Sequence, residues 1–134
     1  MEERTYGGKR GHEGTDLMPP TNQRGFYPVF SATAGTVEHM GWLQKGGWRI
    51  GIRSKQGGYF YYAHLSEYAP GMEEGKTVEA GEMLGYMGDS GYGEEGTVGQ
   101  FAVHLHFGIY IQTADGREVS VDPYWILKGL EGEP

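Results

Sequence analysis

The sequence has 134 residues, a formal net charge of −7 and 25 glycines. A chain of this length usually forms one domain, so we predict a single domain over residues 1–134. An acidic chain without a basic stripe is a poor partner for nucleic acid, and we expect no nucleic-acid partner. The sequence contains no cysteine, which excludes disulfides, thiolate zinc sites and cysteine nucleophiles.

We expect no membrane insertion by this chain. The longest apolar run, Tyr59 to Ala63, is far shorter than the roughly 20 residues of a membrane-spanning helix. The first residues, MEERTYGGKRGHEG, lack the apolar segment of a signal peptide, so no export signal is expected within them.

Apolar and aromatic runs bounded by glycine predict short strands, because glycine permits the positive φ angles of tight turns. After an irregular segment, 1–27, the expected strands in chain order are Gly35–Leu43, Gly47–Arg53, Tyr59–Leu65, two short strands between Val78 and Met87, and Val103–Ile111. Residues 88–100 are expected to form a long glycine-rich loop. A short C-terminal helix is expected from Asp122 as N-cap, through Pro123 and Tyr124 to Lys128, ending at Gly129. The predicted fold class is therefore mostly β, a single domain of antiparallel sheet.

Two histidines on the last predicted strand are the first functional signal. His104 and His106 are two residues apart, so both side chains leave the same face, about 7 Å apart along the strand. Their neighbours Leu105 and Phe107 point the other way. Two imidazoles on one sheet face mark a polar site.

A second pair lies near the start of the chain. If the backbone were extended, His12 and Asp16 would stand about 13 Å apart, too far to share an ion whose ligand bonds are near 2.1 Å. Gly14, between them, allows the chain to bend so that both can converge. His64 has the strand parity of Phe60, so by itself it is as readily explained as a packed core histidine.

These histidines and Asp16 can supply a set of three nitrogen and oxygen ligands without cysteine. Such a set is typical of a catalytic zinc site, because structural sites usually close with four protein ligands. Two neutral histidines and one carboxylate leave residual positive charge, which lowers the pKa of bound water towards about 7. Two histidines then remain for acid–base chemistry near neutral pH.

Four segments together resemble the lysostaphin-type (LytM-like) zinc metallopeptidases, which cut peptide bonds in bacterial peptidoglycan. They are HEGTD (12–16), YYAHLS (61–66), GEMLGYMGDSG (81–91) and HLHFGI (104–109). The likeness runs in order from about residue 11 to 127. Each segment alone is a weak signal, but the ordered combination is specific.

The resemblance implies that one Zn²⁺ is held by His12, Asp16 and His106, and that His64 and His104 are catalytic histidines that do not bind the metal. It implies an open groove, a peptidoglycan peptide as substrate, and attack of zinc-activated water on an amide carbonyl. It also implies an extracytoplasmic location, secreted or in the cell envelope. Which of His64 and His104 is the general base stays open, as does the oligomeric state.

Two other functions remain as alternatives. A member of the same fold can be a catalytically silent scaffold or binding domain in envelope or sporulation assemblies. The segment from Lys76 to Gly85 is also similar to the hairpins of lipoyl-type carrier domains, although no lysine lies at the required turn. The segment TNQRGFYPVF (21–30) and the loop 88–103 are longer than is common in the peptidase family, which affects the expected substrate preference and leaves the metal site unchanged.

Overall fold

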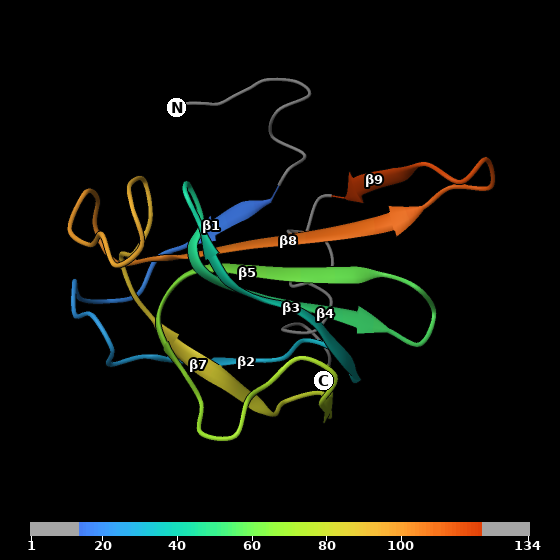
Figure 1. The fold of residues 1–134 in the computed structure, drawn as a ribbon, viewed down its shortest axis with the longest axis horizontal. Coiled ribbons are helices and arrows are strands. Elements are labelled where there is room, and N and C mark those ends of the chain that lie inside the picture. Colours follow the sequence, from blue (N-terminus) through green and yellow to red (C-terminus); the bar gives the residue numbers. More distant parts are fainter. Residues whose placement is uncertain (1–13, 122–134) are drawn as a thin grey trace.

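The structure is a computed structural model, and it describes residues 14–121. Within that range the chain forms nine strands and no helix (Figure 1). The strands are β1 (Thr15–Leu17), β2 (Pro28–Phe30), β3 (Gly35–Leu43), β4 (Gly47–Ser54), β5 (Tyr59–Tyr68), β6 (Thr77–Val78), β7 (Met83–Met87), β8 (Leu105–Gln112) and β9 (Glu118–Val121). The predicted C-terminal helix, from Asp122 to Gly129, lies outside the described residues.

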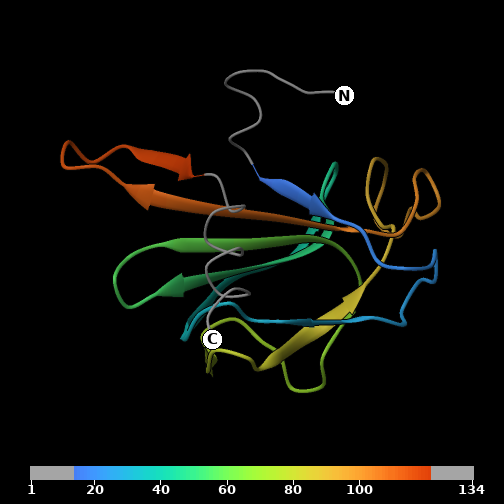
Figure 2. The ribbon, with the colours of Figure 1, turned by 180° about the vertical axis from the view of Figure 1, so that it is seen from behind.

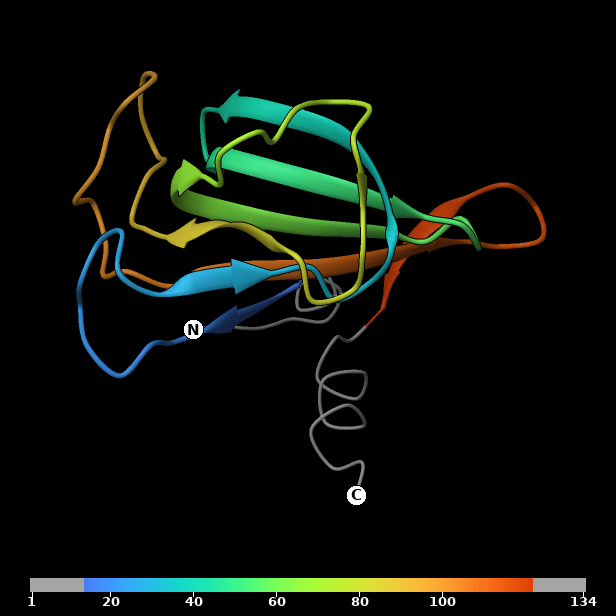
Figure 3. The same cartoon turned by 90° about the horizontal axis from the view of Figure 1, so that it is seen from below.

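All strand pairs are antiparallel, and the main order across the sheet is β1-β8-β5-β4-β3-β6. Strand β9 pairs with β8, beyond the segment of β8 that pairs with β1. The far end of β5 leaves this plane and pairs with β7, which in turn pairs with β2. Figures 2 and 3 show that β2 and β7 lie across one face of the four long strands.

The hydrophobic core fills the space between the long strands and the β2–β7 pair. Its buried members come from seven strands: Val29, Val37, Ile50, Ile52, Tyr62, Leu65, Val78, Leu84, Leu105, Phe107 and Ile109. On β8 the apolar residues point into this core as the alternation predicts, whereas Ile111 is exposed because the strand continues beyond the core. Burying one face of the long strands leaves the opposite face available for a groove.

The predicted mostly-β fold of antiparallel sheet is confirmed. The four long strands lie where expected to within three residues, but β1, β2 and β9 were not predicted. The first two have only three residues each, too few for an alternation of apolar and polar residues to be recognised. Among residues 14–121, no helix is long and apolar enough to cross a membrane.

Candidate active site

Strand β1 brings Asp16 to the two histidines of the last segment. Asp16 lies directly opposite His106 in the antiparallel β1–β8 register. The Asp16 Oδ1 atom is 2.8 Å from His106 Nδ1 and 3.7 Å from His104 Nε2. The hydrogen bond from His106 lowers the pKa of the Asp16 carboxyl against the opposing effect of partial burial, and the nearby imidazoles lower it further. Asp16 is therefore a carboxylate at neutral pH.

Position 14, between the predicted ligands His12 and Asp16, requires glycine. Gly14 has a φ of +130°, a conformation that side chains with a Cβ rarely adopt. A Cβ there would lie 2.7 Å from the Phe107 carbonyl oxygen and 2.8 Å from His106 Nε2. The absence of a side chain at Gly14 lets β1 approach β8 closely beside the His106 ring. His12 lies outside the described residues.

A β-bulge turns His64 away from the position that its strand parity predicts. Trp48 on β4 faces Leu65 on β5, and Ile50 faces Tyr62, so β5 contains one extra residue between these pairs. His64 lies in this bulge with a φ of +66°, which is uncommon for a residue other than glycine. The imidazole consequently lines the groove instead of packing in the core beside Tyr62. His64 thus lies outside the hydrophobic core, although by itself it could equally have been a packed core histidine.

The surroundings of His64 fix its protonation. Its Nδ1 lies 2.8 Å from the Ser90 carbonyl oxygen. Because a carbonyl oxygen can only accept, Nδ1 carries the proton and Nε2 is left as an acceptor. Burial lowers the pKa of His64 to about 4, so the ring is neutral at physiological pH.

His104 is held in the same way by a different carbonyl. Its Nδ1 is 2.9 Å from the Ala102 carbonyl oxygen, so Nδ1 donates and Nε2 is directed towards the site. The ring centroids of His64 and His104 are 4.8 Å apart, and those of His64 and His106 are 6.1 Å apart. Two imidazoles with backbone-anchored Nδ1 atoms thus lie side by side next to Asp16 and His106.

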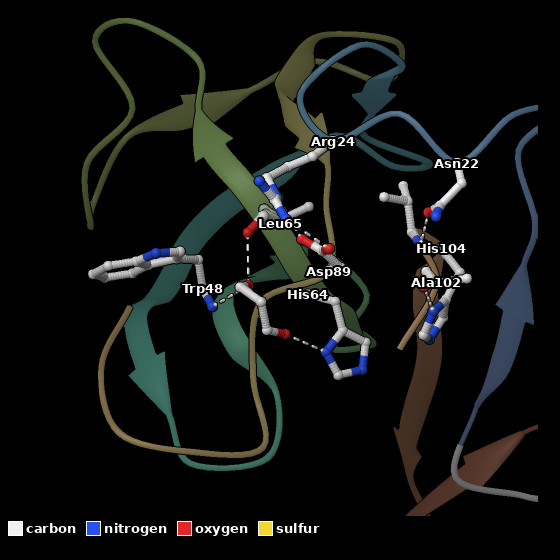
Figure 4. A network of polar contacts seen from close by, with 10 residues as sticks. Asn22, Arg24, Trp48, His64, Leu65, Asp89, Ala102 and His104 are labelled. Carbon is white, nitrogen blue, oxygen red and sulfur yellow. Dashed lines mark hydrogen bonds and ion pairs between the residues drawn. The ribbon is translucent and has the colours of Figure 1, made fainter. Parts of the chain in front are cut away.

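The segment from Gly88 to Gly91 holds both of these histidines in place, which the sequence did not predict. Figure 4 shows the polar contacts around His64, His104 and Asp89. The Gly88 carbonyl accepts a hydrogen bond from the His104 backbone N–H, and the Ser90 carbonyl accepts from His64. The Ser90 hydroxyl donates to the Leu65 carbonyl at 2.7 Å and accepts from the Trp48 N–H at 3.1 Å. Ser90 is fully buried and so links the bulged part of β5 to the loop that follows β7.

Asp89 in the same segment is anchored by a residue of the 21–30 segment. Arg24 donates from Nε and from one terminal nitrogen to the two carboxylate oxygens of Asp89, at 2.7 and 3.1 Å. Asp89 is 5 % exposed, and this paired geometry satisfies its buried charge. The only sequence signal for this role was the serine and aspartate between glycines in GDSG.

Aromatic rings from the long loop cover the two histidines. The Phe101 ring centroid is 4.7 Å from that of His64 and 5.1 Å from that of His104. Tyr92 stacks on the outer side of His64 at 6.1 Å and contacts Phe101. The loop 88–103, which was expected to affect substrate preference, therefore contacts the site directly.

A cavity of about 510 Å³ lies beside these side chains and has the size of a small-ligand site. Its lining includes His64, His106 and the tyrosines Tyr61, Tyr92 and Tyr110. These three tyrosines line the cavity, whereas Tyr62 is buried in the core. His39, to which no role was given, lies on β3 and its ring contacts Tyr59.

The donor set at this site suits a zinc ion. A carboxylate oxygen of Asp16 and an imidazole nitrogen of His106 converge on one point, and both are ligand types that zinc accepts. Residues 14–121 by themselves contain no group of three histidine or acidic side chains arranged to hold a metal ion. The predicted third ligand is His12, which is not among these residues.

Comparison with known proteins identifies the family. The sequence matches Peptidase family M23 over residues 10–123. This chain belongs to peptidase family M23. Peptidases of this family are generally zinc-dependent.

Three relatives illustrate the likeness. An L-Ala–D-Glu endopeptidase of Bacillus subtilis (strain 168) is 46 % identical over 129 residues, which are 96 % of this chain and 38 % of that protein. A Ruminococcus gnavus protein assigned as a glycyl-glycine endopeptidase LytM is 61 % identical with a TM-score of 0.85, covering 93 % of this chain and 49 % of that one. The catalytic domain of lysostaphin from Staphylococcus simulans has a TM-score of 0.65 at 30 % identity, covering 87 % and 79 %. The chain spans less than half the length of the first two proteins.

Proposed function

We propose that this M23 domain is a zinc-dependent endopeptidase that hydrolyses peptide bonds of bacterial peptidoglycan outside the cytoplasm. The observation that carries the proposal is the convergence of Asp16, His64, His104 and His106 beside a cavity that His64 and His106 line. Membership of a peptidase family and relatives named as endopeptidases support the same activity.

His12, Asp16 and His106 would hold the zinc ion. When bound there, zinc supplies a Lewis acid that polarises a water molecule and the scissile carbonyl group. Asp16 contributes a negative charge and His106 a nitrogen donor, and the close approach allowed by Gly14 keeps both on the same side of β8.

His64 and His104 are the groups that move protons. Each keeps one proton at Nδ1, where a backbone carbonyl oxygen accepts it, and each presents Nε2 as the acceptor. One of these Nε2 atoms takes the proton of the attacking water and delivers it to the leaving amine. The other would enter the reaction as an imidazolium that has taken its second proton from solvent, and it would donate a hydrogen bond from Nε2 to the oxygen on which charge develops. Which of His64 and His104 takes which role stays open.

A catalytically silent scaffold of the same fold is not favoured. A silent member would be expected to lack one or more of the site residues, whereas Asp16, His64, His104 and His106 are all present and the His64 ring contacts those of His104 and His106. No residue of 14–121 fills the cavity, which remains large enough for part of a peptide.

Mass spectrometry of peptidoglycan fragments tests the proposed function. Peptidoglycans with different cross-bridges would be incubated with the protein, with and without a zinc chelator, and with the His39→Ala variant as a control for histidine replacement. We expect new fragments with free amino groups, absent with chelator and restored by added zinc. Intact peptidoglycan of every type, with one zinc ion measured per chain, would overturn the proposal.

A further inference from the structure

A second cavity adjoins the first along the groove. It has a volume of about 310 Å³ and is lined by Leu43, Arg49, Tyr59, Tyr61, Tyr110 and Glu118. Tyr61 and Tyr110 border both cavities, so the two form one continuous path over β4, β5 and β8. Tyr61 also contacts the His106 ring, with 6.4 Å between centroids. A peptide bound at the histidines would therefore extend into the second cavity.

The second cavity contains a cation that differs from its neighbour on the same strand. Arg53 is neutralised by two carboxylates, Glu38 at 2.8 Å and Glu118 at 3.0 Å. Among residues 14–121, the one hydrogen-bond acceptor of the Arg49 side chain, four residues earlier on the same face of β4, is the Met40 carbonyl oxygen at 2.7 Å. No carboxylate within residues 14–121 forms an ion pair with Arg49. In a chain of net charge −7, a half-buried arginine without a carboxylate indicates a place for an external anion.

Two hydroxyl groups beside Arg49 can add hydrogen bonds. Burial raises the pKa of Tyr61 to about 12 and also raises the pKa of Tyr59. Both phenols therefore keep their protons at neutral pH and can donate to an anion. Glu118, the acidic residue on the rim, is held by Arg53, which limits its repulsion of such a ligand.

We propose that Arg49 binds a carboxylate group of the peptide substrate, carried by a residue that flanks the scissile bond. This inference rests on the proposed endopeptidase function and restricts its preferred substrates to acidic peptides. A guanidinium distinguishes a carboxylate from a carboxamide, because only the carboxylate forms charge-assisted hydrogen bonds through two oxygens. A glutamyl residue that continues a peptide through one carboxyl group leaves the other one for Arg49. A bond between two glycines offers no such group.

A pair of matched peptides tests this subsite. Both contain an L-Ala–D-Glu bond, and they differ only in whether the remaining carboxyl group of D-Glu is a carboxylate or a carboxamide. For the wild-type protein we expect a higher kcat/KM on the carboxylate peptide. The Arg49→Gln variant should lose about 10- to 100-fold on that peptide, as expected for a hydrogen bond to a charged group. On the carboxamide peptide it should change by less than about threefold.

Two further variants sharpen the test. Arg49→Lys keeps the charge without the planar fork and should lose less than Arg49→Gln on the carboxylate peptide. Lys55→Gln removes an exposed positive charge from the β4–β5 turn, away from the cavity, and should match the wild type on both peptides. An equal loss on both peptides for Arg49→Gln would overturn the carboxylate subsite.

Binding measurements distinguish the absence of the carboxylate subsite from the absence of hydrolytic activity. Calorimetric titration of the chelator-treated protein with each peptide measures affinity without hydrolysis. Tighter binding of the carboxylate peptide that disappears in Arg49→Gln supports the subsite even if no peptide is cleaved. Hydrolysis of both peptides at the same rate, with equal affinities, supports the proposed endopeptidase and rejects the subsite.

Discussion

On β8 the core residues alternate as in a regular strand, whereas β5 departs from this alternation at the bulge that contains His64. Tyr62 and Phe107 are both buried in the core with ring centroids 5.1 Å apart. On the groove side, an extra residue and a positive φ at His64 place its ring beside His104. The core residues of β8 follow from the regular alternation of a strand. The position of the His64 ring in the groove depends instead on a single extra residue in β5.

Replacing His106 tests the groove side most severely. We expect His106→Ala to lose most of its zinc and all measurable peptidoglycan hydrolysis, because it removes a proposed ligand opposite Asp16. Zinc content by atomic emission and fragment release by mass spectrometry measure the two losses. If the variant kept one zinc ion per chain, the proposed ligand set would be wrong. The His39→Ala protein serves as the control.

Replacing Phe107 tests the core side through stability. Phe107→Ala should lower the free energy of unfolding by about 3–5 kcal/mol, because the ring is 2 % exposed and its removal leaves a cavity. Tyr92→Ala on the groove side, where the ring is 56 % exposed, should change it by less than about 1 kcal/mol. Urea denaturation measures both. Similar losses for the two variants would remove the distinction between the faces.

Replacing either histidine whose Nδ1 is anchored by a backbone carbonyl should lower activity without removing the metal. His64→Ala and His104→Ala should each retain zinc while the hydrolysis rate falls by about 10²-fold or more, the usual contribution of an acid–base group. Zinc analysis and fragment release are again the measurements. A variant that cleaves at the wild-type rate would exclude that histidine from the mechanism.

The smallest expected effect concerns a hydroxyl group in the core. The Tyr62 hydroxyl accepts a hydrogen bond from the Ala32 N–H at 2.9 Å, so Tyr62→Phe should cost about 1 kcal/mol at neutral pH. Burial raises the pKa of Tyr62 to about 12, above the value near 10 of an unfolded tyrosine.

The pH dependence of this variant follows from that difference. Between pH 10 and 12 the folded state keeps the Tyr62 proton while the unfolded state loses it. The contribution of this proton to the free energy of unfolding is therefore fully present below pH 10 and is lost as pH rises through this range. Tyr62→Phe should show a shallower fall in urea denaturation at pH 9 to 11. A fall as steep as that of the wild type would mean that Tyr62 does not contribute to it.

The sequence predicted the parts of this structure that depend on repetition. Alternation on β8 placed Leu105 and Phe107 in the core and His104 and His106 together on the other face. Parity alone could not place His64 on the groove side, because a single inserted residue reverses the parity of a strand and has no signature in composition.

Contacts between distant segments were also beyond the reach of the sequence pattern. The anchoring of His64 by Ser90 and of Asp89 by Arg24 joins residues 26 and 65 positions apart, and neither pair follows from local spacing. The family resemblance identified the segment GDSG without assigning a role to its serine. The metal-ligand set, which includes His12, stays a prediction.

The pairing of β1 with β8 has a consequence for the order of events during synthesis. Asp16 and His106 are 90 positions apart in the chain, and strand pairing across such a separation forms late and slowly. A growing or unfolded chain therefore lacks the proposed site until nearly all of its sheet has been made. A hydrolase built in this way would have no activity during its own synthesis. It would become active only when β8 has paired with β1.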